Sequence, residues 1–112
     1  MKKDNITFPN FTKIDMRVGE VKSAAPVEGS KKLIELTIDL GEDYGTVTVL
    51  TGLLQFYKPE DFVGKKLGII ANLEPRPMMG KLSQGMIMAV DTEEKPIPLF
   101  LDNSYKNGTI IR

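Results

Sequence analysis

The chain has 112 residues, 41% hydrophobic and 27% charged, with fifteen acidic and fifteen basic side chains and therefore no formal net charge. This length and composition predict one globular domain spanning residues 1–112. Because the chain has no cysteine and no histidine, disulfides and Ser-His-Asp or Cys-His nucleophilic centres are excluded, and we expect no metal and no cofactor.

The N-terminus has no apolar segment after Lys2 and Lys3, so it does not resemble a signal peptide. No apolar run approaches the roughly 20 residues that a membrane-spanning helix needs. We therefore expect a soluble, cytoplasmic protein. Zero net charge argues against binding of polyanions by bulk charge, but it allows a local basic patch.

In the first half of the chain, apolar residues alternate with polar ones, as is typical of β-strands. Residues 14–21 form the first predicted strand, and a change of phase at residues 19–20 indicates a β-bulge or a barrel corner there. Residues 34–40 and 46–52 predict two strands of a hairpin, because the glycine-containing turn sequence 41–45 separates them.

The second half begins with two predicted helical turns, residues 52–57 and 58–64. Two strands, 67–73 and 85–90, follow on either side of a loop that contains Pro75, Arg76 and Pro77. Residues 97–101 and 109–111 predict short strands in a C-terminal extension.

These elements predict an all-β protein. The expected fold is a five-stranded OB-fold barrel with one or two short helical turns and a C-terminal β extension, and an SH3-like barrel is the alternative.

Positive charge is concentrated in residues 64–86, which contain one acidic residue, Glu74, and four basic ones, Lys65, Lys66, Arg76 and Lys81. Such a segment in a neutral chain predicts a surface for an anion, and structured RNA is the anion that we favour. The central strands carry no aromatic platform of the kind that binds single strands, which favours recognition of a folded RNA by its shape.

Several segments occur in an order that resembles the tRNA-binding domain family: IDMRVGEV, SKKL, LTGL, YKPEDFVGKKL, ANLEPR and LSQGMIMA. The resemblance spans about residues 8–90. This family includes stand-alone dimeric proteins, C-terminal domains of methionyl-tRNA synthetases and parts of phenylalanyl-tRNA synthetase β chains, and CsaA-type export chaperones form a related branch. The resemblance implies a non-catalytic OB fold that recognises the shape of tRNA with little sequence preference. It also implies a homodimer formed through the C-terminal extension, and an aminoacyl-tRNA synthetase as a further partner.

The resemblance also implies a set of tRNA-binding residues, which are Lys31, Lys32, Asn72, Arg76, Lys81, Ser83, Gln84 and Met86. The chain departs from the family at Glu74 and Pro77, where many members have lysine, and at Met79, where a basic residue is common. Each missing cation removes a phosphate contact. We therefore expect weaker RNA binding than in a typical member, or a different RNA.

Some of these residues also have structural interpretations. Arg76 lies between two prolines, which suits bidentate phosphate binding by a fixed guanidinium, or it is a surface arginine in a rigid loop. Ser83 and Gln84 contact phosphate or ribose oxygens, or Ser83 hydrogen-bonds its own backbone in a turn. Asn72 contacts RNA or supports the loop that follows it.

The lysine pair Lys31 and Lys32 is either a phosphate clamp or a solvated turn. Met88 is predicted to face the core. Met86 faces either the core or the RNA. Met78 and Met79 contact RNA or a second protomer.

A second hypothesis is a CsaA-type chaperone or protein-interaction module that binds peptides in a dimer groove. A carboxylate-based enzyme has little support, because the acidic residues form no placed pair. The apolar residues Ile97, Leu99, Phe100 and Leu101 are expected to cover either their own barrel or that of a partner.

Overall fold

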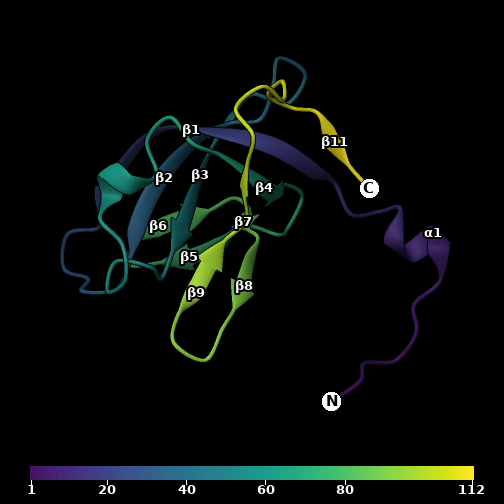
Figure 1. The fold of residues 1–112 in the computed structure, drawn as a ribbon, viewed down its shortest axis with the longest axis horizontal. Helices are drawn as coiled ribbons and strands as arrows, with labels where there is room; N and C mark the ends of the chain where they lie inside the picture. Colours follow the sequence, from purple (N-terminus) through teal and green to yellow (C-terminus); the bar gives the residue numbers. More distant parts are fainter.

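The strand β1 (Met16–Pro26) organises the structure, because it pairs along both of its edges. Residues 16–20 pair antiparallel with β4 (Lys66–Ile70), and the later part of the strand pairs with β2 (Ile34–Asp39). The computed structural model describes residues 1–112, and Figure 1 shows β1 crossing the barrel as one long, curved strand. A strand shared in this way lets a sheet bend back on itself, as a small barrel requires.

The bulge in β1 lies at Lys22, so the prediction of a bulge at residues 19–20 is wrong. The change of phase there has another cause. Gly19 faces the core, where an added Cβ atom would lie only 2.6 Å from the Cγ2 atom of Ile38. Because successive residues of a strand point to opposite faces, Val18 faces outward, where the backbone of the C-terminal segment hydrogen-bonds to it and covers it.

The predicted hairpin is confirmed as β2 and β3 (Thr46–Thr51), which pair antiparallel along their whole lengths. In β2, buried Ile34, Leu36 and Ile38 alternate with partly exposed polar residues. Both glycines of the connecting turn have left-handed backbone, with φ of +97° at Gly41 and +96° at Gly45. Glycine adopts this conformation without a steric penalty.

One of the two predicted helical turns is confirmed as η1 (Pro59–Asp61), a 3-10 helix. Its start is fixed by the carboxylate of Asp61, which accepts a hydrogen bond from the Lys58 amide at 2.9 Å. Residues 52–57 form hydrogen-bonded turns but no helix. The structure adds one helix that the sequence did not predict, α1 (Phe8–Phe11) in the N-terminal arm, which Thr7 caps.

The segment around Pro75-Arg76-Pro77 is a β-hairpin, whereas we predicted a loop. Its strands are β5 (Arg76–Met78) and β6 (Lys81–Ser83). The turn consists of Met79 and Gly80, with φ of +52° and +78°. Two successive residues with positive φ are typical of a type I′ turn, whose twist suits antiparallel strands.

The predicted strand 85–90 is divided into β7 (Met86–Ile87), which pairs with β4, and β8 (Ala89–Asp91), which pairs with β9 (Pro96–Pro98). In Figure 1 the hairpin of β8 and β9 projects from the barrel.

The prediction that Met88 faces the core is wrong, because Ile87 occupies that position at 7% exposure. An added Cβ atom on Gly68 would lie 3.2 Å from the Sδ atom of Met88 and 3.5 Å from Ile111. Met88 therefore covers the outer face of β4.

The C-terminal extension covers its own barrel. The strand β10 (Phe100–Leu101) pairs with β4, and β11 (Ile110–Ile111) pairs with β1. Several of its apolar side chains nevertheless stay more than one third exposed, including Ile97 at 38%, Phe100 at 45% and Ile110 at 48%.

The barrel interior is a single apolar cluster of thirteen buried residues, namely Val21, Ile34, Leu36, Ile38, Leu40, Val47, Val49, Leu53, Phe62, Leu67, Ile69, Ala71 and Ile87. The five predicted barrel strands correspond to β1, β2, β3, β4 and β7, so the all-β, OB-type prediction is confirmed. The two helices have four and three residues, and neither is a candidate membrane span.

Candidate functional site

A surface groove lies where the end of β3 meets the segment that follows β4. Ten residues line it, and they come from the end of β3, from residues 73–78 and from residues 83–86: Leu50, Thr51, Gly52, Leu73, Glu74, Arg76, Met78, Ser83, Gly85 and Met86. Three of the predicted binding residues, Arg76, Ser83 and Met86, therefore share one concave surface. In an OB fold, the loop between the fourth and fifth barrel strands is one of the usual ligand-binding segments.

Two polar side chains attach this segment to β3. The hydroxyl oxygen of Ser83, which is 6% exposed, accepts a hydrogen bond from the Leu50 amide at 3.0 Å and donates one to the carbonyl oxygen of Gly85 at 3.2 Å. The Gln84 side-chain oxygen accepts from the Thr48 amide at 2.9 Å, and the Gln84 amide donates to the Thr48 carbonyl at 2.8 Å. These bonds close the barrel beside the groove and place Arg76 at its rim.

Arg76 is exposed, and none of the four ion pairs in the structure involves it. It begins β5, between two prolines that restrict the backbone. A guanidinium presents five N–H donors in a planar arrangement that matches the oxygens of a phosphate. The groove therefore has a charged rim whose charge no protein carboxylate neutralises by direct contact.

Lys31 and Lys32 lie in the loop between β1 and β2, the second usual ligand-binding loop of an OB fold. The hydroxyl oxygen of Ser30 accepts hydrogen bonds from the amides of Lys32 and Leu33, both at 3.1 Å. The two lysine side chains are exposed, and neither forms an ion pair. The turn is thus ordered by its backbone while both ammonium groups stay available.

This loop and the β5–β6 hairpin pack against one another. Val27, Leu33 and Leu50 form a small buried cluster, and Met78 of the hairpin packs on it. At the tip of the hairpin, the Cε atom of Met79 lies 3.4 Å from the place where a Cβ atom on Gly29 would be. The lysine pair and the Arg76 hairpin are consequently parts of one surface.

Lys81 also belongs to this surface, but its charge is paired. Its Nζ atom lies 3.0 Å from the Oε1 atom of Glu35 in β2. The side chains are 45% and 29% exposed, respectively. Lys81 therefore contributes less free positive charge than Arg76.

Asn72 uses its side chain to hold the N-terminal arm. Its Oδ1 atom accepts a hydrogen bond from the Asp15 amide at 2.8 Å, and its Nδ2 atom donates to the Lys13 carbonyl at 2.6 Å. This geometry agrees with the structural interpretation of Asn72, although the segment that it supports is the entry to β1 and not the loop after it.

One arginine away from the groove is paired internally. Arg17 binds Asp15 and Asp43, each at 2.8 Å, and stacks over Tyr44 with its Cζ atom 4.9 Å from the ring centroid. The hydrogen bonds that Arg17 donates to the carboxylates of Asp15 and Asp43 raise the pKa of Arg17, and the bond that Asp43 accepts lowers the pKa of Asp43. The structure contains no group of three or more metal-ligating acidic side chains.

The structure thus brings together Lys31, Lys32, Arg76, Lys81, Ser83, Gln84 and Met86 around one surface, with Asn72 turned toward the arm. Sequence reasoning missed Ser30, Thr48 and Glu35. The position of Ser30 before two lysines is a recognisable turn signal. The roles of Thr48 and Glu35 can be recognised only in the folded structure, where the β5–β6 hairpin lies against β2 and β3.

A family model described as "Putative tRNA binding domain" matches residues 16–110. The methionine–tRNA ligase of Clostridium acetobutylicum is 44% identical over 98% of this chain, and that of Methanocaldococcus jannaschii is 41% identical over 99% of it. The chain spans only 17% of the length of either ligase.

Two solved structures have similar folds. A methionyl-tRNA-synthetase-related protein from Pyrococcus horikoshii superposes with a TM-score of 0.91 at 32% identity, covering 98% of this chain and 100% of that one. The chaperone CsaA of Picrophilus torridus superposes with a TM-score of 0.87 at 25% identity, covering 96% and 100%.

Proposed function

The chain belongs to the tRNA-binding domain family, and we propose that it binds folded tRNA through the surface formed by the β1–β2 loop and the β5–β6 hairpin. In this proposal residues 1–112 act as one non-catalytic module in the cytoplasm. The module delivers or retains tRNA for a methionine–tRNA ligase, either as a part of that enzyme or as a separate partner.

The observation that supports this proposal best is the unpaired Arg76 at the rim of a groove, beside the unpaired Lys31 and Lys32. Phosphate contacts dominate the affinity of proteins for nucleic acids. Three free cations on one face of a chain with no net charge suit a folded RNA backbone that offers several phosphates at once. Met86, which is 48% exposed inside the groove, adds an apolar contact for a ribose or a base.

Ser83 and Gln84 have a different role in the proposal. Their hydrogen bonds to Leu50 and Thr48 already engage most of their polar atoms. We therefore assign them to positioning of the hairpin, with the free side-chain NH₂ group of Gln84 as the remaining donor for RNA. Asn72 is assigned to the same kind of role for the N-terminal arm.

The experiment is a titration of bulk tRNA by fluorescence polarisation at several salt concentrations. Arg76→Ala is expected to weaken binding and to make the negative slope of log K against log[salt] shallower by about 1, because one phosphate contact is lost. The double variant Lys31→Ala/Lys32→Ala should make this slope shallower by about 2. Lys106→Ala removes an exposed, unpaired cation outside this surface and outside the groove beside β11, and is the control for which no change is expected.

Absence of tRNA binding by the wild-type protein at low salt would contradict the proposal. Capture of extended peptides by the same protein would then favour the chaperone-type function. Equal losses from Arg76→Ala and Lys106→Ala would contradict the location of the surface but not the activity.

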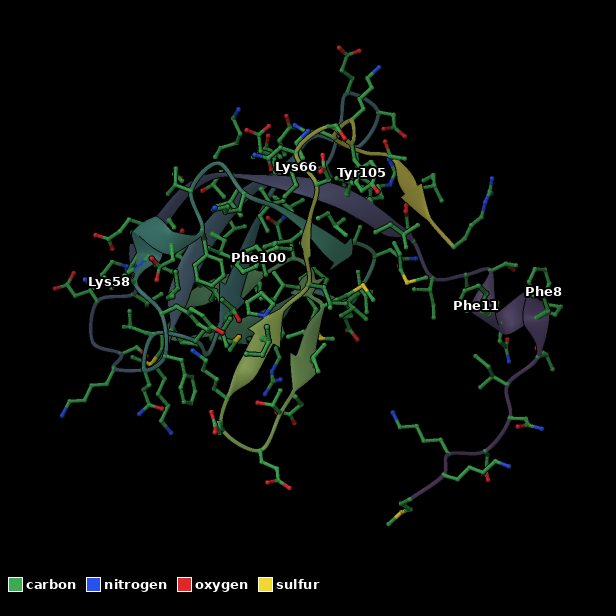
Figure 2. All side chains as sticks on the ribbon, in the orientation of Figure 1. Phe8, Phe11, Lys58, Lys66, Phe100 and Tyr105 are labelled. Atoms are coloured by element: carbon green, nitrogen blue, oxygen red, sulfur yellow. The ribbon has the colours of Figure 1, made fainter.

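The proposal includes a homodimer formed through the C-terminal extension. A groove beside β11 is lined by Phe8, Phe11, Ile14, Met16, Ile110 and Ile111, together with Thr12 and Arg112. Figure 2 shows Phe8 and Phe11 on α1, away from the barrel. Phe8 is 74% exposed in the single chain. A second copy would remove this apolar surface from water, which is the main driving force for association.

Ile110→Lys tests the dimer, because a charge on the exposed face of β11 opposes burial there. Analytical ultracentrifugation should show a dimer for the wild-type protein and a monomer for the variant. Val63→Lys alters a similarly exposed apolar residue, 47% against 48% for Ile110, and should stay dimeric. A monomeric wild-type protein would contradict this part of the proposal.

A further inference from the structure

The outer face of β2 carries an acidic residue, Glu35, next to the β5–β6 hairpin of the proposed tRNA surface. Glu35 lies between Ile34 and Leu36, whose side chains are fully buried, so its own side chain points to the outer face of the sheet. Its cross-strand partner is Leu50, which lines the groove. Glu35 therefore lies beside the β5–β6 hairpin, facing the approaching RNA.

The contact of this carboxylate is with Lys81. The Oε1 atom of Glu35 lies 3.0 Å from the Nζ atom of Lys81. Lys81 is held opposite Met78 in the hairpin, and Met78 packs on the buried cluster that includes Leu50. Glu35 and Lys81 thus lie on strands whose relative position is fixed by packing, so neither side chain of the ion pair lies on a loop.

This is the one ion pair on the proposed surface. The other three involve Arg17 or Lys22, which lie on β1. Arg76, Lys31 and Lys32 stay unpaired, whereas Lys81 is neutralised. A phosphate that approaches Lys81 must replace the carboxylate, and it also meets the negative charge of Glu35.

We propose that Glu35 is an affinity-limiting residue of the tRNA-binding surface, which holds Lys81 in the free protein and opposes its contact with RNA phosphate. The inference rests on the proposed function. It adds, besides Glu74 of the groove lining, a second acidic residue that weakens binding by this surface.

The expected effect of Glu35→Gln is tighter binding. The amide is almost the same size as the carboxylate and keeps a hydrogen-bond acceptor, but it carries no charge. Exposed ion pairs contribute little energy, so we expect affinity for bulk tRNA at low salt to rise by about threefold to fivefold. The increase should shrink at high salt, because exposed charges are screened.

A double-mutant cycle separates this mechanism from a general change in charge. Affinity for bulk tRNA is measured for the wild-type protein, Glu35→Gln, Lys81→Gln and the double variant. The gain from Glu35→Gln should be largely lost when Lys81 is already glutamine. Glu42→Gln is the matched control, because it removes the same charge from the exposed turn at the other end of β2 and β3, and it should change affinity little.

Three outcomes would overturn the inference: unchanged or weaker binding by Glu35→Gln, an equal gain in the Lys81→Gln background, or an equal gain from Glu42→Gln. Glu35→Thr, which copies the neighbouring Thr37 on the same face, gives a second test if the glutamine variant unfolds in urea earlier than the wild-type protein. If the wild-type protein binds tRNA, Arg76→Ala abolishes this binding and Glu35→Gln does not change it, the inference is contradicted and the proposed function stays intact. Failure of every variant and of the wild-type protein to bind tRNA would reject both.

Discussion

The hydroxyl oxygen of Ser83 and the backbone amide of Leu50 lie 3.0 Å apart, although 33 residues separate them in the chain. This hydrogen bond connects the end of β6 to β3. Leu50 also belongs to the small cluster on which Met78 packs. The Ser83 side chain is therefore one of the contacts that join the barrel to the hairpin that carries Arg76.

Ser83→Ala should destabilise the fold by about 1–3 kcal/mol, because the Leu50 amide loses its acceptor in a buried position. The midpoint of urea unfolding should fall accordingly. Affinity for tRNA should fall as well, since the hairpin loses its attachment.

Ser23→Ala is the matched control for this prediction, because Ser23 is an exposed serine of β1. It should change stability by less than about 0.5 kcal/mol. If Ser83→Ala is equally mild while tRNA binding is lost, Ser83 contacts the RNA itself and does not act through the hairpin.

Asn72→Ala should release the N-terminal arm without unfolding the barrel. The side chain of Asn72 binds Lys13 and Asp15 at the entry to β1, where the bonds are solvent-exposed. We expect a loss of about 1 kcal/mol in stability. Hydrogen exchange should show faster exchange at the Asp15 amide and little change at the Val49 amide, which lies in the core strand β3.

An unchanged exchange rate at Asp15 would show that the arm is held by other contacts. Asn103→Ala, in an exposed C-terminal turn, removes the same type of side chain from a different place and should leave the exchange of Asp15 unaltered.

The hairpin that carries Arg76 shows where sequence reasoning was sufficient and where it was not. The β2–β3 hairpin was predictable, because its alternation and its glycines are local signals. The β5–β6 hairpin was not, since two prolines and a methionine at positive φ are all unfavourable for it locally. Its pairing is stabilised by tertiary contacts, namely Met78 on the small cluster and Ser83 on Leu50.

The candidate site was likewise predictable only in part. Exposed cations such as Arg76 are recognisable from residue type and from family resemblance. The partners of Ser83 and Lys81 lie on strands 33 and 46 residues earlier, and no local pattern encodes such pairs. The same limit explains why the prediction that Met88 faces the core was wrong. Alternation alone does not distinguish the inner face of a barrel from an outer face that the C-terminal segment covers.

Met79 offers a test of backbone strain in the hairpin turn. It is the one residue other than glycine with positive φ, at +52°. Asparagine tolerates this conformation better than methionine, and β-branched residues tolerate it worst. Met79→Asn should therefore raise the free energy of unfolding by about 0.5–1 kcal/mol, and Met79→Val should lower it by at least as much.

The order of the three urea midpoints checks this prediction. A valine variant as stable as the wild-type protein would indicate that the turn adopts another conformation in solution. Affinity for tRNA, measured in the same proteins, should follow the order of stability only if the turn geometry positions Arg76.

Glu20 should make the stability of the barrel depend on pH. The hydrogen bond from the Asn107 side chain, at 2.8 Å, lowers the pKa of Glu20 below its ordinary value of 4.5, and the nearby Lys22 and Lys66 charges act in the same direction, while burial opposes them. A carboxyl group whose pKa is lower in the folded than in the unfolded state stabilises the fold above the unfolded pKa. That contribution is lost as the pH falls through the folded pKa.

Asn107→Ala removes the largest cause of this shift, so the stability difference between the wild-type protein and the variant should be constant above about pH 5 and should shrink as the pH falls below 4.5. Urea unfolding at pH 7, 4.5 and 3 measures it. In a Glu20→Gln background the pH dependence of the difference should disappear, which separates Glu20 from Asp39, the second carboxylate that Asn107 contacts, at 3.1 Å. A difference that keeps its pH dependence in that background would assign the effect to Asp39, and a difference that grows on acidification would contradict the sign of the shift at Glu20.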